Sequence, residues 1–159
     1  MDVHRLLWLA TQAQTHRRIV EVGSFMGQST RALADNTEGM VFAFDNWQGP
    51  WDVEMTTEER QAIRSTFETN LAEHLASGKV VMLTGDHRRP PTGLHPDMVF
   101  IDGDHAYESV LLDVSFWRAQ LTPGGLLCGD DWDHVPVHSA ILQLMSQPMV
   151  YENLWSVYV

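Results

Sequence analysis

The chain has 159 residues, the length of one domain, and its 44% of hydrophobic residues can fill a single core without a disulfide framework. Its formal net charge of -11 disfavours nucleic acid and anionic lipid as partners, because both bind clustered Lys and Arg. The single cysteine, Cys128, cannot form an internal disulfide, and the N-terminal residues lack the pattern of a secretory signal. No apolar run approaches the roughly 20 residues that cross a bilayer. We therefore expect one cytoplasmic domain, residues 1–159, that binds neither nucleic acid nor membrane.

Helices and strands are predicted to alternate through the first half of the chain. Asp2 is placed to cap a first helix, in which apolar residues recur at helical spacing. Thr56 and Glu59 have the spacing of a capping box, and apolar residues then repeat every fourth position until Gly78, which predicts the end of that helix. The elements expected here are the helix after Asp2, a strand over 18–22, a helix over 28–34, a strand over 40–44, one helix from Thr56 to Gly78 and a strand over 80–83.

The second half of the chain continues the alternation after one irregular crossover. Residues 87–96 contain three prolines, which disfavour a helix, so we expect a bare loop there. A long apolar helical face ends at a Thr-Pro-Gly-Gly turn, and Pro136 is placed for the first turn of a last helix. The elements expected here are a strand over 98–101, a helix over 107–121, a strand over 126–128, a helix from Pro136 to Met145, and one strand or a short antiparallel pair over 149–159.

Five short apolar strands separated by crossovers predict an α/β fold with a parallel sheet. We expect a Rossmann-like, open, twisted and mostly parallel sheet with helices on both faces, a three-layer sandwich. In such a sheet the ligand crevice lies beyond the carboxyl ends of the strands. The residues that follow each strand are therefore the candidates for a functional site.

Glycine and aspartate follow the first three strands. Gly23 and Gly27 would let the backbone approach a ligand at a helix N-terminus, and a tight strand-to-helix turn is the less favoured alternative. Their G-x-x-x-G spacing differs from the dinucleotide fingerprint and disfavours a nicotinamide cofactor. Asp45 stands 22 residues beyond Gly23, where Rossmann-like sites place a carboxylate that accepts both ribose hydroxyls. Asp86, after Gly85, could accept a hydrogen bond from an exocyclic amine or serve as a turn residue.

Three aspartates follow the fourth and fifth strands. If these strands are neighbours, the carboxylates of Asp102, Asp130 and Asp131 converge on one point of the crevice. Convergent carboxylates repel one another unless a cation pairs them, and oxygen ligands suit Mg²⁺, with Ca²⁺ or Mn²⁺ as alternatives. In the competing interpretation, Asp102 only faces the cofactor while Asp130 or Asp131 caps a helix.

Several motifs carry a resemblance to a known family. The most specific reads VFIDGDHAYE over residues 99–108, and PGG and GDDW follow it within residues 123–132. The turn EVGSFMG at 21–27 and the triplet DNW at 45–47 agree with it. Over about residues 18–131 the chain resembles the class I S-adenosylmethionine-dependent methyltransferases. Within that class it is similar to the small-molecule O-methyltransferase branch, which includes macrocin-type macrolide-sugar and aminocoumarin methyltransferases.

The resemblance implies a role for each of these groups. Gly23, Ser24 and Gly27 would line the methionine and ribose end of S-adenosylmethionine, while Asp45 would hold the ribose and Asp86 would meet the adenine. The acidic residues resemble the magnesium site of catechol O-methyltransferase and its relatives. The expected cofactors are S-adenosylmethionine and Mg²⁺ or another hard divalent cation. The residues expected to bind the methyl donor are Glu21, Gly23, Ser24, Gly27, Ser29, Asp45, Asn46, Trp47, Gly85, Asp86 and Asp102, and the metal ligands are Asp102, Asp130 and Asp131.

Two residues are candidates for the catalytic base. A metal lowers the pKa of a bound hydroxyl, and a nearby carboxylate or imidazole can take its proton. The resemblance to sugar O-methyltransferases favours Asp104, whereas His105 has the ordinary pKa better suited to a base near neutrality. We take Asp104 as the first candidate and His105 as the second.

Other polar and aromatic residues near these motifs have two interpretations each. His134 and His138 are candidates for further ligands or substrate contacts, but such residues near a helix start more often lie at the surface. Trp47, Trp51 and Trp132 lie in loops on the expected ligand side, where they would stack on adenine, close over substrate, or pack beneath the loops.

The function expected is that of a metal-assisted O-methyltransferase acting on a small hydroxylated metabolite or sugar. The chain is short for this branch, and only the loop at residues 46–55 is available as a lid, so a homo-oligomer that completes the pocket would fit. Two alternatives keep the fold: a cofactor-binding module without transfer activity, and a relative of the proteins called cephalosporin hydroxylases. A dinucleotide-dependent oxidoreductase is disfavoured by the glycine spacing.

Overall fold

The strands form one sheet in the order β3-β2-β1-β4-β5-β7-β6 in this computed structural model, which describes residues 1–49 and 53–159. Strands β1 to β5 pair in parallel, and β7 pairs antiparallel with both β5 and β6. The predicted parallel core and the antiparallel pair at the end are confirmed. The strands are β1 (Arg18–Val22), β2 (Met40–Asp45), β3 (Val80–Thr84), β4 (Met98–Ile101), β5 (Leu126–Gly129), β6 (Met149–Tyr151) and β7 (Leu154–Tyr158).

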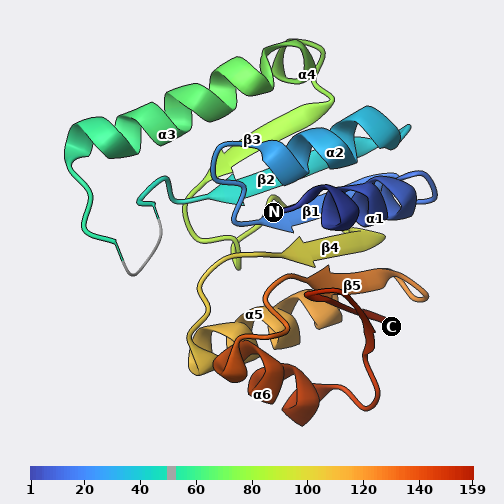
Figure 1. Cartoon of the computed structure of the whole chain (residues 1–159). Coiled ribbons are helices and arrows are strands. Elements are labelled where there is room, and N and C mark those ends of the chain that lie inside the picture. The colour runs from blue at the N-terminus through green and yellow to red at the C-terminus, as the bar shows by residue number, and fades with distance from the viewer. Residues whose placement is uncertain (50–52) are drawn as a thin grey trace.

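The helices begin where the capping residues predict. The Asp2 side chain accepts hydrogen bonds from two backbone N–H groups of the first helix, and Thr56 and Glu59 form the predicted reciprocal capping box. None of the helices in the described residues is long and apolar enough to cross a membrane. The helices are α1 (Val3–Ala13), α2 (Gln28–Asn36), α3 (Thr57–Asn70), α4 (Ala72–Ala76), α5 (Tyr107–Gln120) and α6 (Val135–Leu144) (Figure 1).

The helix predicted from Thr56 to Gly78 is instead two helices, so this prediction was wrong. Leu71 breaks the segment between α3 and α4, with φ -108° and ψ 13°. The neighbouring Asn70 side chain donates a hydrogen bond to the Met26 carbonyl at 2.9 Å, and Leu71 is fully buried. A contact with the turn after β1 therefore overrides the continuous apolar repeat.

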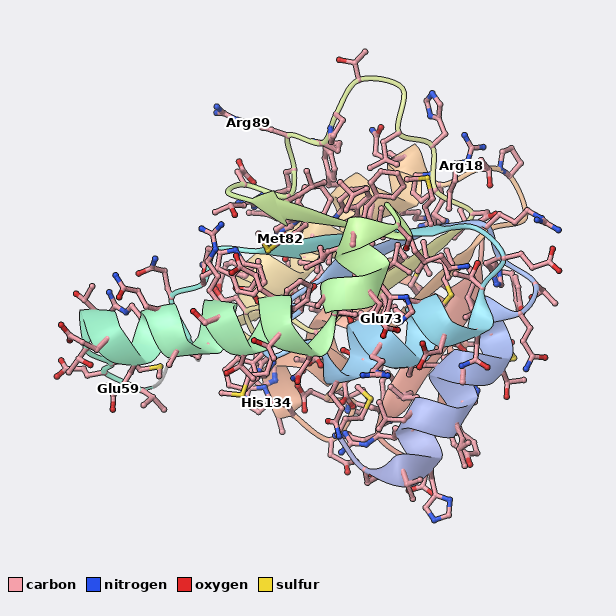
Figure 2. The ribbon with its side chains drawn as sticks, turned by 90° about the horizontal axis from the view of Figure 1, so that it is seen from above. Arg18, Glu59, Glu73, Met82, Arg89 and His134 are labelled. Carbon is pink, nitrogen blue, oxygen red and sulfur yellow. The ribbon has the colours of Figure 1, made fainter. Side chains whose placement is uncertain are left out.

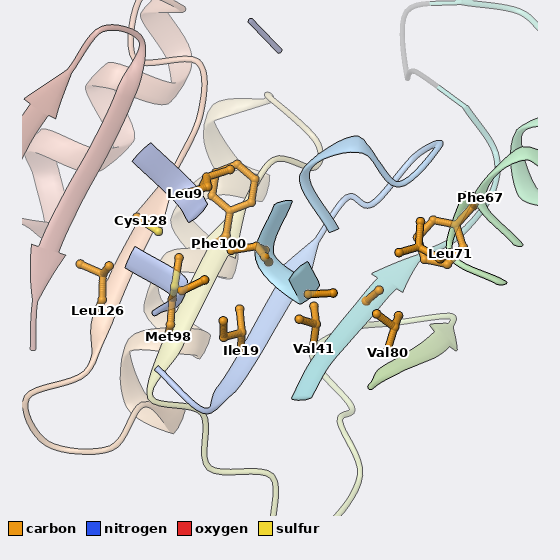
Figure 3. Packing of buried hydrophobic residues seen from close by; sticks show 14 of the residues in the cluster. Leu9, Ile19, Val41, Phe67, Leu71, Val80, Met98, Phe100, Leu126 and Cys128 are labelled. Atoms are coloured by element: carbon orange, nitrogen blue, oxygen red, sulfur yellow. The ribbon is translucent and has the colours of Figure 1, made fainter. Parts of the chain in front are cut away.

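Each face of the sheet is covered by its own helices. On one face, alternate strand residues such as Ile19 and Phe100 pack with Leu9 of α1 and Phe67 of α3 (Figure 3). On the other face, the intervening residues of the strands pack against α5 and α6, with Trp117 fully buried. The three layers are those predicted.

The crossover from β3 to β4 contains no helix or strand in residues 85–97, all of which the structure describes, as its prolines predict. This crossover runs on the side of the sheet opposite α4, as the positions of Arg89 and Glu73 show (Figure 2). Leu94 of this crossover is buried and packs in the cluster of Trp117. His87 of the crossover thereby lies beside α5 without an intervening helix.

The carboxyl ends of β1 and β4 meet at Gly23. Its φ of +88° lies in the left-handed region, and its N–H donates to the Phe44 carbonyl at 2.9 Å. A Cβ at this position would stand 2.0 Å from the Asp102 carbonyl oxygen. Glycine is therefore required here both by the backbone conformation and by the approach of β4.

Replacing this glycine tests how tightly the strand ends meet. We expect Gly23→Ala to lower the free energy of unfolding by about 1–2 kcal/mol for the positive φ and by about 1–3 kcal/mol more for the steric overlap. Gly93→Ala is the matched control, because Gly93 also has a positive φ, +83°, but nothing lies within 4 Å of its added Cβ. Urea denaturation followed by circular dichroism measures both. Equal losses in the two variants would contradict the proposed overlap.

Candidate active site

A cleft of about 440 Å³ opens at the carboxyl edge of the parallel strands. Its walls come from the turns after β1, β2, β3 and β4, which contribute Gly23, Asp45, Gly85 and Asp102, and from the first half of α5. This volume falls in the range of small-molecule sites. The fold thus brings together segments that are far apart in the sequence, at the edge where ligands of open α/β sheets bind.

Asp45 fixes the turns after β1 and β2 to each other. Its Oδ2 accepts a hydrogen bond from the Phe25 N–H at 2.8 Å, and its Oδ1 accepts one from the Trp47 N–H at 2.7 Å. Asp45 lines the cleft, and Asn46 lines it beside Asp45. Each carboxylate oxygen has a second lone pair, so Asp45 can still accept hydrogen bonds from a ligand.

Trp47 belongs to the core. Its side chain is 5% exposed, its Nε1–H donates to Thr84 Oγ1 at 3.0 Å, and its ring lies 5.0 Å from that of Phe67. Of the two interpretations of this tryptophan, the structure agrees with packing beneath the loop. Trp132 lies 4.2 Å from the ring of His138, and Trp51 falls outside the described residues.

Glu21 is a buried acceptor beneath the glycine turn. It accepts hydrogen bonds from Ser24 Oγ at 2.7 Å and from Thr30 Oγ1, and its other oxygen, Oε1, has no hydrogen-bond partner among the described residues. Burial raises the pKa of Glu21 above its ordinary value. Glu21 and Ser24, together with Ser29 and Gly27, therefore shape the turn from behind and are not among the described residues that line the cleft.

Asp102 and His105, which line the cleft, form a cluster with Asp131 whose candidate ligand atoms all lie within 4.8 Å of one another. His105 Nε2 lies 2.9 Å from Asp131 Oδ2. Asp130 is held differently, because the Arg5 guanidinium binds its two oxygens at 2.7 and 2.8 Å. The structure thus unites two of the three predicted metal ligands with His105, and pairs the third with an arginine.

The carboxylates of this cluster affect one another's protonation. Burial raises the pKa of Asp102 to about 7, and the Asp130 and Asp131 charges act in the same direction. The hydrogen bond with Asp131 raises the pKa of His105, and the same bond lowers the pKa of Asp131. A positive charge placed among these groups would therefore be strongly stabilised.

Comparison with known proteins identifies the family. A family model described as a methyltransferase domain matches residues 20–132, which is most of the chain and includes the glycine turn, Asp45 and the acidic cluster. The chain belongs to this methyltransferase domain family. The match confirms the predicted class of enzyme, a methyltransferase. A search of curated proteins found no match.

Solved structures share the fold of this methyltransferase at low sequence identity. Cofactor-bound Rv0187 from MTB has a TM-score of 0.72 and 17% identity, over 100% of this chain and 80% of that one. TomG, an O-methyltransferase from Streptomyces achromogenes solved with S-adenosylmethionine, has a TM-score of 0.69 and 16% identity, over 99% and 81%. An O-methyltransferase from Bacillus cereus solved with S-adenosylhomocysteine has a TM-score of 0.67 and 17% identity, over 100% and 82%. The predicted Rossmann-like methyltransferase fold is confirmed.

The two candidate bases of the methyltransferase both line the cleft, but they differ in their partners. Asp104 Oδ1 accepts from the Ala106 N–H at 2.9 Å, and Oδ2 accepts from Ser109 Oγ at 2.6 Å. Although partial burial acts to raise its pKa, the hydrogen bonds from Ser109 and Ala106 lower it overall. Asp104 thus holds the first turn of α5, and a carboxylate of lowered pKa is the weaker base. His105 is oriented by Asp131 and has the higher proton affinity.

Asp86 does not line the cleft, although Gly85 before it does. The Asp86 carboxylate accepts a hydrogen bond from the Arg88 N–H at 3.1 Å and contacts Arg88 Nε at 3.3 Å, which agrees with the turn interpretation. His134 stands near the cluster, with its ring 5.7 Å from that of His105.

Sequence reasoning missed a second polar group in the cleft. His87 Nε2 lies 3.3 Å from the carboxylate of Asp113, and the Trp117 Nε1–H donates to His87 Nδ1 at 3.1 Å. Asp113 is only 4% exposed, yet it lines the cleft together with His87 and Arg88. The available signal was a carboxylate on the apolar face of the predicted helix, between Val110 and Trp117.

The raised pKa of Asp102 predicts that this residue lowers the stability of the fold in a pH-dependent way. Because the folded pKa, about 7, exceeds the ordinary value of 3.8, ionising Asp102 costs stability that grows as the pH rises toward 7. We expect Asp102→Asn to raise the Tm more at pH 8 than at pH 5.5, in buffer containing EDTA. Asp104→Asn is the control: the folded pKa of Asp104 lies below 3.8, so its effect should be the same at both pH values. Thermal melts that show no pH difference for Asp102→Asn would contradict this cost.

Proposed function

We propose that this chain is an S-adenosylmethionine-dependent O-methyltransferase that acts on a small hydroxylated metabolite or sugar. The observation that supports this most is the cleft itself, which is lined by Gly23 and Asp45 and by Asp102 and His105, two members of the cluster with Asp131. Asp45 provides acceptors for ribose hydroxyls. The cluster provides a negatively charged site and a base beside the same cleft. Both lie on the carboxyl edge of a methyltransferase fold.

The methyl donor would bind along the edge from the glycine turn toward β2. Asp45 would accept hydrogen bonds from the two ribose hydroxyls, with its orientation fixed by the Phe25 and Trp47 N–H groups. Gly23 lines the cleft, so the donor would lie along its backbone. When bound, S-adenosylmethionine supplies a methyl group on a positively charged sulfonium, and the carboxylates of this edge favour that charge.

Transfer to oxygen needs an acceptor hydroxyl that can lose its proton. His105, held by Asp131 at 2.9 Å, is the base that the contacts favour, and Asp104 is the second candidate because Ser109 and Ala106 already occupy its oxygens. This reverses the order expected from the sequence. With His105 Nε2–H donating to Asp131, His105 Nδ1 would accept the hydroxyl proton, and Asp131 would stabilise the imidazolium that results.

A divalent cation fits the donor set of this cluster. Two carboxylates and one imidazole within 4.8 Å of one another are ligand types that Mn²⁺ and other divalent cations accept, and Mg²⁺ would use the carboxylates. When bound, such a cation would lower the pKa of an acceptor hydroxyl. His105 would act either as a base or as a cation ligand. If His105 binds the cation, Asp104 would take the proton of the acceptor hydroxyl.

The partners proposed follow from charge and exposure. We propose a small-molecule acceptor rather than nucleic acid or membrane, because the net charge of -11 opposes anionic partners. Cys128 is buried and forms no disulfide, which supports a cytoplasmic location. A homo-oligomer that completes the pocket remains part of the proposal.

Two other functions make different predictions. A cofactor-binding module would bind S-adenosylhomocysteine without converting S-adenosylmethionine in the presence of any hydroxylated acceptor. An iron-dependent hydroxylase normally uses two histidines and one carboxylate, whereas the cluster has one histidine and two carboxylates. Mass spectrometry of products formed from S-adenosylmethionine and a panel of phenols, catechols and glycosides would detect methyl transfer to oxygen. Neither the binding module nor the hydroxylase would form such products.

Calorimetric titration with S-adenosylhomocysteine is the direct test of the donor site. We expect Asp45→Asn to weaken binding by roughly tenfold or more, because it removes a charged acceptor of hydrogen bonds. Asp86→Asn is the matched control: it also neutralises a carboxylate after a strand, but Asp86 does not line the cleft, so the affinity of this variant should stay near that of the wild type. No binding by the wild-type chain, or equal losses in the two variants, would sink the proposed site.

A further inference from the structure

We propose that Arg5 is an internal counter-ion of the active site and limits how strongly the site binds divalent cations. This inference rests on the cation site of the proposed function and names the residue of α1 that controls it. Sequence reasoning assigned Arg5 no role. The Arg5 side chain extends from the first turn of α1 to the carboxyl edge of the sheet, where it contacts Asp130, 125 residues later in the sequence.

The contact between Arg5 and Asp130 is close and largely shielded from solvent. Arg5 Nη1 lies 2.7 Å from Asp130 Oδ1 and 2.8 Å from Oδ2, and the two side chains are 17% and 6% exposed. The Asp131 N–H also donates to Asp130 Oδ1, at 2.9 Å. Both oxygens of Asp130 are therefore bound to the guanidinium, and a cation that used Asp130 as a ligand would lie beside the positive charge of Arg5.

The guanidinium is held in place from its other side. Arg5 Nε donates to Asp2 Oδ2 at 2.7 Å, while Asp2 Oδ1 accepts from the His4 and Arg5 N–H groups as the cap of α1. Helix α1 is itself anchored, since Leu9 and Ala13 are fully buried. Figure 1 shows the start of α1 near the carboxyl ends of β1 and β4. Arg5 is thus presented to Asp130 by a fixed helix.

The charge balance of the site follows from this pair. Asp102, Asp130 and Asp131 lie together, and Arg5 contributes the one guanidinium bound to them among the described residues. A cation at Asp102, His105 and Asp131 would have two carboxylate ligands instead of three and would feel the nearby positive charge of Arg5. Both effects weaken cation binding.

Removing Arg5 should therefore strengthen the binding of Mn²⁺. The probe is Mn²⁺ alone, titrated into the whole chain and followed by electron paramagnetic resonance of the free ion. We expect Arg5→Met to bind Mn²⁺ roughly tenfold or more tightly than the wild type, the size of effect that groups beyond the ligands have on metal sites. A structural role of Arg5 alone would leave the affinity unchanged or lower it.

Three further variants separate charge from structure. Arg5→Lys keeps the positive charge and should keep wild-type affinity. The double variant Arg5→Met with Asp130→Asn removes one positive and one negative charge, so the net charge stays the same. Its affinity for Mn²⁺ should return to near that of the wild type. Asp2→Asn removes a charge that contacts Arg5 but can still cap the helix, and it should show no gain.

The thermal shift caused by Mn²⁺ is measured in parallel, because it reports binding even in a variant of low stability. No gain in Arg5→Met by either readout, or a gain that persists in the double variant, would overturn the proposal. Titration of the same variants with S-adenosylhomocysteine keeps this question apart from the proposed function. Failure of that titration would reject the donor site and leave the Mn²⁺ result to be judged by itself.

Discussion

The parallel pairing of β1 and β4 is the constraint on which the site depends. Because the N–H of Asp102 donates to the Val22 carbonyl at 2.8 Å and Gly23 stands directly against the Asp102 backbone, the first carboxylate of the cluster is fixed beside the glycine turn. The pairing of β4 with β5 then brings Asp130 and Asp131 to the same edge. A donor site and an acidic site become neighbours through backbone hydrogen bonds alone, before any side chain contact is made.

This convergence has an electrostatic cost that the rest of the structure offsets. The Asp102 carboxylate is disfavoured by burial and by its neighbours, Asp131 is stabilised by His105, and Asp130 is stabilised by Arg5. The partners come from two different parts of the chain, since His105 follows β4 and Arg5 lies on α1. A folded state that already neutralises part of the charge needs less from a bound ligand, and a cationic methyl donor or a divalent cation would supply the remainder.

The sequence alone predicts the features that depend on local pattern. The bounds of β1 and β4, the cap of α1, the capping box of α3 and the bare crossover before β4 all follow from apolar runs, caps and prolines within a few residues. The break at Leu71 could not be predicted, because its cause is a contact with Met26 and Gly27. The same limit applies to the site: Asp102 and Asp131 were expected to meet, but the bond of Asp130 to Arg5 joins residues whose proximity only the fold creates. Likewise, the hydrogen bond from the Ser109 hydroxyl of α5 to Asp104 is a contact that only the folded structure shows.

The crossover between β3 and β4, which has no helix or strand, places His87 at the wall of the cleft. Without a helix between β3 and β4, His87 lies directly against α5, where Trp117 fixes one ring nitrogen as an acceptor and the other faces Asp113. A buried carboxylate is costly unless it is paired, so Asp113 on an otherwise apolar helical face requires this histidine and the nearby Arg88. The loop that appears least ordered in the sequence is therefore held by a polar contact at the wall of the cleft. A ligand that reaches this wall would therefore meet His87 in a defined tautomer. It would not meet Asp86, the residue before His87, because Asp86 does not line the cleft.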